Sequence, residues 1–431
     1  MASYSSVKAL AERVERKNSN SANLFLNGVL KDKIFARLKQ LQFGSLTILY
    51  KGDSYQFSGD EYLHLTAKIE VNHEQFFRYL AFGGSVGAAE AYINNYWSTD
   101  DLTNVIRLFA LNQAVMDSVD HGMARVTAPL KQFFHYLNKN TQRGSKRNIV
   151  AHYDLGNDFF EQFLDSSMMY SSGIFCSLDE SMEQASINKL ERICKRLRLN
   201  ENDHVLEIGT GWGSFAIYAA KNYGCRVTTT TISNEQFLYA RERIREEGLD
   251  EKITLLDFDY RKLTGKFDKL VSIEMIEAVG HHYFPVFFEK CSSLLKDNGE
   301  MLLQAITIQD QRFDSAKKHI DFIKRYIFPG SCIPSIDSIS ECVTRDTDLR
   351  MLALDDIGVH YAETLKRWRE TFFSNISQIK AQGFSENFIR MWEFYFCYCE
   401  GGFRERVISD IQLHLVKPLA RVPMKLSVLK D

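Results

Sequence analysis

The chain has 431 residues, of which 45% are hydrophobic and 25% charged, and its formal net charge is -2. This composition is that of an ordinary soluble globular protein, and the small net charge argues against a dedicated nucleic-acid binder. No apolar run approaches the ~18 residues that a membrane-spanning helix needs. The length predicts two or three domains of roughly 150 residues each.

The beginning of the chain lacks the continuous apolar core of a signal peptide. Eight cysteines are scattered, and none forms a C-x-x-C pair. We therefore expect a cytoplasmic protein with reduced thiols and without a metal site.

Residues 1–120 are predicted to form a small α+β domain that binds lipid or dimerises. Residues 21–43 have the spacing of an amphipathic helix whose second face is basic. That face either lies on a membrane or is the solvated side of a core helix, and charge runs more often have the second explanation. Strands are predicted at 46–50, 54–58 and 65–71, and helices at 76–82 and 88–97, with Gly83 and Gly84 between them.

Residues 121–147 are predicted to form a basic linker. Six Lys or Arg side chains occur in 121–150, and no Asp or Glu accompanies them. An anionic membrane would attract such a stretch by about 1 kcal/mol per basic residue close to it. A solvated connector explains the composition equally well, so both interpretations stay open.

Residues 148–431 are predicted to form a doubly wound, Rossmann-like α/β domain, because strands and helices alternate there. An aromatic-rich insert at about 309–345 interrupts the alternation and is expected to cover an apolar acceptor. Helices are expected to dominate the last eighty residues. Strands are predicted at 205–208, 226–231, 253–257, 269–273 and 300–306, and helices at 182–197 and 234–247.

A glycine-rich turn is predicted between the strand at 205–208 and the next helix. Glycines there let a ligand approach the backbone and permit positive φ. The pattern E-x-G-x-G-x-G, which begins at Glu207, resembles motif I of S-adenosylmethionine-dependent methyltransferases. A dinucleotide-binding turn would instead place its third glycine at Ser214. A merely structural tight turn is the remaining alternative.

Several separated motifs resemble the cyclopropane-fatty-acyl-phospholipid synthase family, which is related to the mycolic acid cyclopropane synthases. The resemblance covers 148–431 nearly in full and is weaker in the N-terminal domain. The motifs are HYDLGNDFF at 152–160, MYSSG at 169–173, TISNEQ at 231–236, MIE at 275–277 and CEGGFR at 399–404.

This resemblance implies that a methylene group passes from S-adenosylmethionine to the cis double bond of an unsaturated phospholipid acyl chain. The enzyme would then work on the inner surface of the membrane, with phospholipids as its partners. The resemblance also implies a set of cofactor contacts: Tyr170, Ser171, Glu207, Gly209, Thr210, Gly211, Trp212, Gly213, Thr231, Ile232, Gln236, Phe258, Asp259 and Ile273.

In this family a bound bicarbonate accepts the proton. By position, Glu277, Tyr361 and the backbone N–H groups of Ser172 and Ile306 would hold the anion. Gln304 stands where many members have His, and Gln cannot add positive charge or relay a proton.

Cys399 aligns with a cysteine that was once proposed as a nucleophile in the family. The mechanism has no step for a thiolate, and a structural cysteine is the alternative.

Two further hypotheses stay open. Weaker deprotonation beside Gln304 would give a methyl-branched or methyl-alkene chain without ring closure. A catalytically silent lipid-binding protein with the same fold is the other. The sequence decides neither the acyl chain length, the headgroup and the double-bond position nor whether the protein is a homodimer.

Overall fold

The computed structural model of the protein describes residues 26–113 and 155–423, which form two compact units. The first unit combines residues 26–113 with the distant segment Ser385–Gly401. The second contains residues 155–384 and 402–423. The segment Ser385–Gly401 thus differs from the sequence-based domain boundaries, which place it in the methyltransferase domain. The predicted basic linker at 121–147 lies outside the described residues.

The N-terminal unit contains a four-stranded sheet with the order β2-β1-β3-β4. β1 and β2 form the predicted antiparallel hairpin, and the turn residues Lys51 and Gly52 have φ values of 54° and 88°. Positive φ at both central residues is the signature of the type I′ turn that suits hairpins. The third predicted strand is confirmed as well. The strands are β1 (Phe43–Tyr50), β2 (Asp53–Ser58), β3 (Glu61–Val71) and β4 (Trp97–Ser98).

The amphipathic helix at the start of this unit covers residues 26–38 within the described part of the chain. Leu30, Ile34 and Leu38 are each no more than 4% exposed. Because this apolar face is buried, the basic face is the solvated side of a core helix.

In its described residues, the N-terminal unit has three further helices. α2 (Gln75–Ile93) spans the two helices that the sequence predicts, with a kink at Gly84, where φ is 59°. α3 (Leu102–Leu111) begins at Asp101, whose side chain accepts a hydrogen bond from the N–H of Asn104. α16 (Glu386–Arg404) lies in this unit as far as Gly401.

Polar contacts fix α16 in the N-terminal unit. The Arg390 guanidinium donates to the carbonyl oxygens of Tyr92 and Trp97 at 2.7 and 3.1 Å. The Tyr92 hydroxyl donates to Glu393 at 2.7 Å. These partners are about 300 positions apart in the chain, so no local sequence pattern predicts their contacts.

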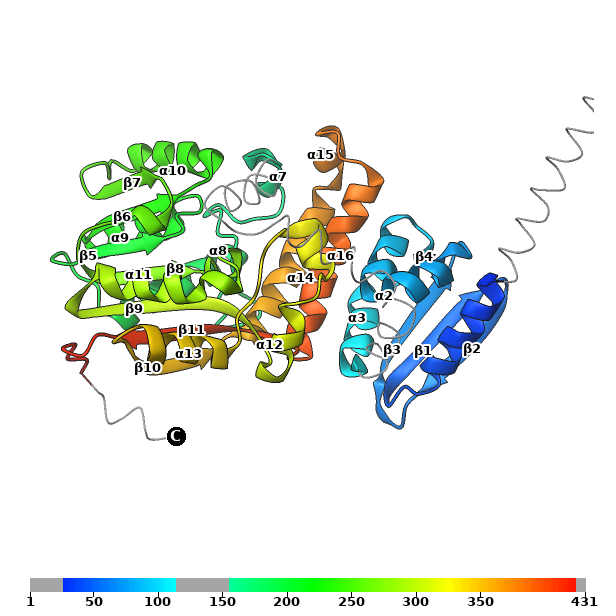
Figure 1. Cartoon of the computed structure of the whole chain (residues 1–431). Coiled ribbons are helices and arrows are strands. Elements are labelled where there is room, and N and C mark those ends of the chain that lie inside the picture. The colour runs from blue at the N-terminus through cyan, green and yellow to red at the C-terminus, as the bar shows by residue number, and fades with distance from the viewer. Residues whose placement is uncertain (1–25, 114–154, 424–431) are drawn as a thin grey trace, which may run out of the picture. The chain divides into compact units, whose positions relative to one another are not determined.

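The second unit contains a seven-stranded sheet with the order β10-β11-β9-β8-β5-β6-β7 (Figure 1). β5 to β9 are parallel, whereas β11 runs antiparallel to both β9 and β10. All five predicted strands are confirmed, and with them the α/β class. The strands are β5 (His204–Ile208), β6 (Arg226–Thr231), β7 (Ile253–Asp257), β8 (Phe267–Ile273), β9 (Leu295–Ile308), β10 (Arg350–Asp356) and β11 (Ile408–Val416).

β10 and β11 lie in the part of the chain for which the sequence predicts mainly helices. β11 is buried from Asp410 to Val416 because β9 and β10 flank it. Its sequence nevertheless alternates apolar Ile411, Leu413 and Leu415 with polar Asp410, Gln412 and His414, a strand pattern that the sequence analysis overlooked.

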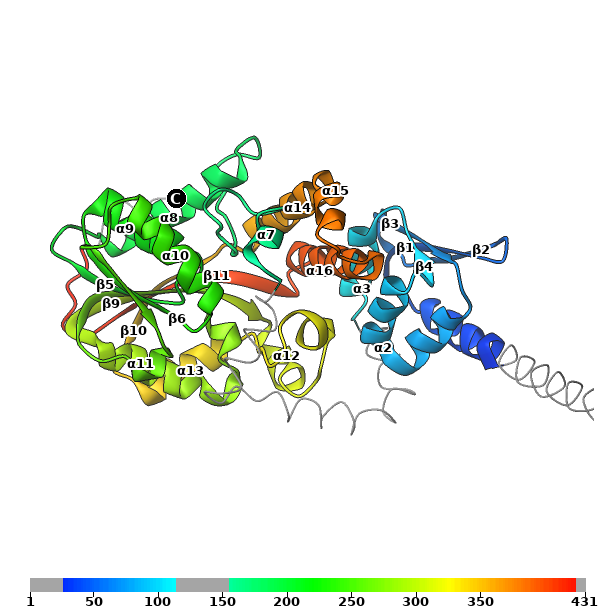
Figure 2. The same ribbon diagram turned by 90° about the horizontal axis from the view of Figure 1, so that it is seen from above.

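Helices cover both faces of this sheet (Figure 2). α8 (Met182–Leu197) and α9 (Ser214–Tyr223) pack on one face, and α11 (Phe284–Leu294) and α13 (Ile336–Asp346) pack on the other. α8 has the predicted bounds, because Ser181 caps its first turn and Arg198 ends it in the left-handed conformation. The remaining helices are α7 (Asn157–Phe160), α10 (Asn234–Glu246), α12 (Asp310–Ala316), α14 (Gly358–Ser374) and α15 (Ile376–Ala381), with short turns of 3-10 or π type at Tyr260–Lys262, Ile276–Ala278, His281–Tyr283 and Ile323–Ile327.

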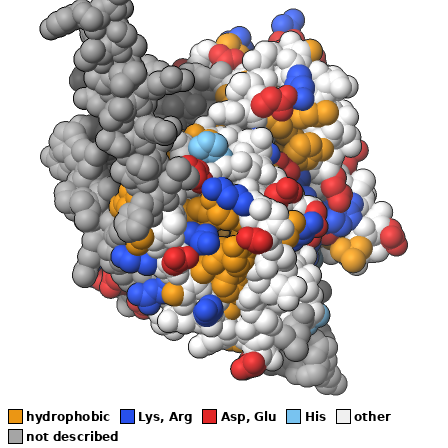
Figure 3. Space-filling model, turned by 90° about the vertical axis from the view of Figure 1, so that its right-hand side faces the viewer, with side chains coloured by type: hydrophobic (Ala, Val, Ile, Leu, Met, Phe, Trp, Pro, Cys, Tyr) orange, Lys and Arg blue, Asp and Glu red, His pale blue; other side chains and the backbone are white. Residues whose placement is uncertain are grey.

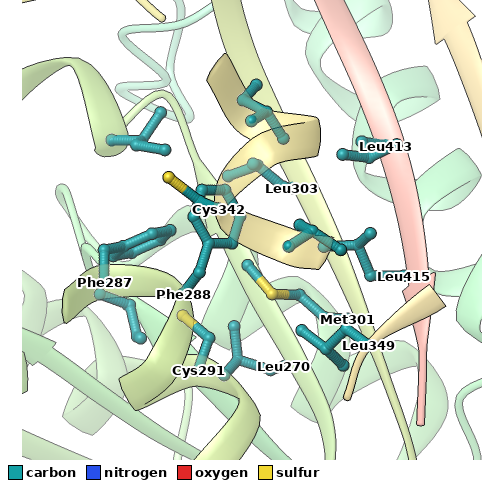
Figure 4. Close-up of a cluster of buried hydrophobic side chains, with 14 of the residues drawn as sticks. Leu270, Phe287, Phe288, Cys291, Met301, Leu303, Cys342, Leu349, Leu413 and Leu415 are labelled. Atoms are coloured by element: carbon teal, nitrogen blue, oxygen red, sulfur yellow. The ribbon is translucent and has the colours of Figure 1, made fainter. Parts of the chain in front are cut away.

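A core of buried side chains lies between β8, β9, β11 and the helices α11 and α13 (Figure 4). Leu303 and Leu413, which pair across β9 and β11, are both fully buried. Cys342 of α13 lies in the same cluster. The C-terminal part of the predicted insert is therefore a core helix.

In the described residues, no helix is long and apolar enough to cross a membrane.

We expect Leu303→Ala to lower the free energy of unfolding by ~2–5 kcal/mol, because it leaves a cavity at the centre of β9. Leu238→Ala on α10, where the side chain is 41% exposed, is the matched control and should change it by less than ~0.5 kcal/mol. Urea unfolding measures both variants. Equal effects would show that β9 does not form the core.

Candidate active site

The site lies at the carboxyl ends of the parallel strands. From β5 the chain proceeds to β6 and β7 on one side, and it then returns to place β8 on the other side of β5. In doubly wound sheets, ligands bind in the crevice at such a switch point.

The glycine turn follows β5 and presents bare backbone at this crevice. Gly209, Gly211 and Gly213 have φ values of 100°, 52° and 91°, which favour glycine. The N–H groups of Gly209 and Thr210 both donate to the Thr230 carbonyl at 3.1 Å. A Cβ on Gly209 would lie only 3.1 Å from Cγ of Met275, so the turn lies directly against the chain that follows β8.

Glu207 is linked to the glycine turn by hydrogen bonds through Thr229. Its carboxyl accepts a hydrogen bond of 2.6 Å from the Thr229 hydroxyl, which is itself 2.7 Å from that of Thr210. Burial raises the pKa of Glu207 to about 8. The residue that distinguishes motif I is thus a buried carboxyl tied to the turn.

Three of the other predicted cofactor contacts lie where β6 ends and α10 begins. The Thr231 hydroxyl donates to Oε1 of Gln236 at 3.0 Å, and both side chains are buried. Ile232 lies beside them, and Ser233 caps α10. This arrangement provides polar groups at the strand end, without the acidic side chain that many methyltransferases have there.

Asp259 follows β7 and is held by Arg261. Arg261 donates to its carboxylate through the backbone N–H and the guanidinium, at 2.5 to 3.0 Å. Although burial opposes the shift, these hydrogen bonds lower the pKa of Asp259, so the carboxylate is charged. The neighbouring Phe258 packs against the core of the sheet. Asp259 therefore serves an ion pair in addition to any ligand.

Aromatic rings surround Tyr170. Its ring centroid lies 5.3 Å from that of Trp368 and 5.4 Å from that of Phe160. Trp212 of the glycine turn is 5.1 Å from Phe160, and its indole N–H donates to Asn157 at 2.7 Å. These packed rings form an apolar cluster, and aromatic faces can stabilise positive charge.

Ser171 accepts a hydrogen bond of 2.5 Å from Nζ of Lys189 on α8. Lys189 is fully buried, and desolvation lowers its pKa to about 8. The charges of Glu274 and Asp410 oppose that shift. Lys189 is therefore a buried cation facing a set of carboxyl groups.

These carboxyl groups belong to Glu274, Glu277 and Asp410. Oε1 of Glu277 accepts a hydrogen bond of 2.6 Å from the N–H of Ile306, whereas Oε2 has no partner. Burial, and then the charge of Glu274, raise the pKa of Glu277 to about 8. Burial and the same two glutamates raise the pKa of Asp410 as well. Burial therefore favours the protonated form of both groups.

Glu274 lies at the centre of the cluster. Its Oε1 accepts hydrogen bonds from the Ser172 N–H at 2.9 Å and from Nε2 of Gln304 at 2.8 Å. Its Oε2 accepts from the Tyr361 hydroxyl at 2.7 Å. The same Nε2 of Gln304 donates to Asp410 at 2.9 Å.

The predicted bicarbonate does not fit this arrangement. Three of its donors, the Ser172 N–H, the Gln304 amide and the Tyr361 hydroxyl, already bind the Glu274 carboxylate. The fourth, the Ile306 N–H, binds Glu277. No step is therefore derived through bicarbonate.

The structure thus gathers Ser172, Gln304, Ile306, Glu277 and Tyr361, as predicted. Cys399 lies half-buried on α16 in the other unit, and its proposed role stays a prediction. The sequence analysis missed Glu274, Asp410, Lys189 and Gln412. The repeated acid in Ile-Glu-Met-Ile-Glu was the available signal for Glu274, because it places a second carboxylate at the end of a strand.

Within the described ranges, no three His, Cys, Asp or Glu side chains are grouped as a metal ion would require.

A glycine turn after the first strand of a parallel sheet, with polar groups at the ends of β6 and β8, defines a class I S-adenosylmethionine-dependent methyltransferase. Comparisons with known proteins agree. The family model for mycolic acid cyclopropane synthetase matches residues 140–413. The chain belongs to this family and is an S-adenosylmethionine-dependent methyltransferase.

Individual relatives include two kinds of enzyme. Cyclopropane-fatty-acyl-phospholipid synthase of Escherichia coli is 36% identical over 357 residues, which are 80% of this chain and 86% of the relative. Tuberculostearic acid methyltransferase UfaA1 of Mycobacterium tuberculosis is 35% identical over 343 residues, 78% and 79% of the two chains. A structure of mycolic acid cyclopropane synthase CmaA1 with S-adenosylhomocysteine has a TM-score of 0.57 at 28% identity and covers 63% of this chain and 98% of its own.

We expect Gly209→Ala to weaken binding of S-adenosylmethionine at least ~10-fold, because the new Cβ meets Met275 and the turn must shift. Gly248→Ala is the matched control: its φ is also positive, at 64°, but its Cβ meets nothing within 4 Å. Titration calorimetry with S-adenosylmethionine measures both. If Gly209→Ala binds S-adenosylmethionine with unchanged affinity, the glycine turn is not part of the cofactor site.

We expect the free energy of unfolding to fall with rising pH more steeply in the wild type than in Glu277→Gln. The folded chain keeps the Glu277 proton to about pH 8, whereas the unfolded chain releases it near 4.5, so stability is lost between these values. The difference should not exceed ~1.4 kcal/mol per pH unit. The exposed Glu289→Gln is the control, and urea unfolding at about pH 5 and about pH 8 is the measurement. If the free energy of unfolding depends on pH in the same way in the wild type and in Glu277→Gln, the pKa of Glu277 is not raised.

Proposed function

We propose that this methyltransferase transfers a methylene group to the cis double bond of unsaturated phospholipid acyl chains and so forms cyclopropane rings. The observation that carries the proposal is the cluster of carboxyl groups and one phenol next to the glycine turn. An alkene is a weak nucleophile, and its methylation leaves a carbocation. Such a reaction needs positioning and a polar group that takes up a proton, both in a site that excludes water.

Residues of the second unit meet these needs. The rings of Tyr170 and Trp212 provide an apolar lining for an acyl chain, and their π faces favour positive charge. The carboxylate of Glu274 adds negative potential, and Glu277 and Asp410 each contribute a buried oxygen without a hydrogen-bond partner. When bound, S-adenosylmethionine supplies the electrophilic methyl group.

A second product is favoured by one observation, the amide at Gln304 in place of an imidazole. If a hydride first moves from the methylated carbon to the neighbouring cationic carbon, loss of a proton from the added methyl group forms a double bond to the chain and gives a methylene-substituted product. Loss of a proton from an adjacent chain carbon instead gives a methyl-alkene. The similarity to UfaA1, named as a methyltransferase, agrees with this alternative.

A phospholipid substrate requires access to a membrane. In the N-terminal unit, Leu26, Val29, Tyr62 and Phe82 are large hydrophobic side chains that are between 36% and 52% exposed. Figure 3 shows hydrophobic side chains at the surface among Lys, Arg, Asp and Glu side chains. These features support peripheral attachment to the membrane, with phospholipids as partners.

Expression in a bacterial host that lacks its own synthase should add one CH2 to monounsaturated acyl chains. Mass spectrometry of the lipids detects a gain of about 14 daltons, the mass of the group added in this transfer. Proton NMR then separates ring methylene protons, near or below zero ppm, from the vinyl protons of a methylene product. Fractionation of the same cells checks membrane attachment. Unmodified lipids, with a chain that still binds S-adenosylmethionine, would refute the proposal.

A further inference from the structure

We infer that the Glu274 carboxylate is a built-in proton acceptor of the methyl-transfer site and takes the place of a diffusible anion. This inference rests on the proposed function, and it names a catalytic residue that the sequence motifs do not indicate.

The donors around Glu274 define an anion site that the chain fills itself. A backbone N–H, a side-chain amide and a phenol converge on one carboxylate at 2.9, 2.8 and 2.7 Å. They come from the segment before α8, from β9 and from α14, so the whole second unit contributes to the site. Three donors from separate elements stabilise a negative charge at a fixed place.

The backbone of Glu274 has an unusual conformation. Its φ is 48°, in the left-handed region that is unfavourable for a residue with a Cβ. Its N–H still donates to the Gln304 carbonyl at 2.8 Å, so the pairing of β8 with β9 extends one residue past the strand. Strain that persists at a named residue of a site is a reason to look for a function.

The position of Glu274 suits proton transfer. It is half-buried, whereas Glu277 and Asp410 are at most 9% exposed. The next residue, Met275, lies against Gly209 of the cofactor turn. Burial raises the pKa of both carboxyl neighbours, whereas three hydrogen-bond donors converge on the Glu274 carboxylate.

The chemical step balances with Glu274 as acceptor. The π electrons of the alkene form a C–C bond to the transferred methyl carbon as its C–S bond breaks, which leaves a carbocation on the acyl chain. A C–H bond of that methyl group then breaks. Its proton forms an O–H bond with the Glu274 carboxylate, and its electron pair closes the third bond of the ring. Release of the proton to water restores the carboxylate.

The test is Glu274→Gly, compared with the wild type in carbon-dioxide-free buffer and in millimolar bicarbonate. Glycine suits the positive φ and opens the anion site without disturbing its donors. Turnover is read as S-adenosylhomocysteine released with vesicles of monounsaturated phospholipid. We expect no bicarbonate dependence in the wild type. Turnover of the variant should fall ~100-fold or more, which is the typical contribution of a general base. Bicarbonate should raise the turnover of the variant at least ~10-fold.

Two further variants make the result specific. Glu274→Gln keeps the shape but not the basicity, so it should lose as much activity without rescue by bicarbonate. Arg406→Gly is the matched control, because Arg406 is exposed and also has a positive φ, of 54°. It should keep wild-type turnover.

Binding of isotope-labelled bicarbonate, followed by carbon NMR, is a readout independent of turnover. Glu274→Gly should bind the anion, and the wild type should not. Bicarbonate binding or stimulation in the wild type would overturn the inference, as would full activity of Glu274→Gly without bicarbonate. If the wild type modifies no phospholipid, the proposed function fails, and the binding comparison alone still decides whether Glu274 fills the anion site.

Discussion

Buried carboxyl groups constrain this site more than any other feature. A charge in an apolar interior is costly unless it is paired, so each acid must find donors or keep its proton. Gln304 meets this requirement for two of them at once, because its amide donates to Glu274 and to Asp410 while its oxygen accepts from Gln412. An imidazole at this position would present a different set of donors and a different charge.

The sheet makes this arrangement possible. Gln304 and Gln412 face each other in the antiparallel pair of β9 and β11. Arg192 of α8 donates to Gln412 at 2.9 Å, so the polar chain continues to the helix layer. β11, one of the two strands that extend the parallel sheet, therefore contributes Asp410 and Gln412 to the site.

The relation between cofactor turn and acid cluster follows from the switch point. β5 and β8 are neighbours, so the segments after them meet, and Met275 packs against Gly209. A methyl donor at the turn and a proton acceptor one residue from Met275 then face the same crevice. On the inference above, the side chain of Glu274 occupies the anion site of this family member. Methyl transfer then does not require a bound anion and is compatible with Gln304.

The sequence by itself determined the elements whose signals are local. The local sequence pattern located α8, and the glycines located the cofactor turn. The ordered motifs identified the family and named Glu277 and Tyr361. Only the tertiary structure showed the contacts of Glu274, whose partners Ser172 and Tyr361 are 102 and 87 positions away. It also decided that α16 belongs to the N-terminal unit and that β10 and β11 complete the sheet. Hydrogen bonds and burial of this kind depend on distance in space, and a chain pattern records only distance along the sequence.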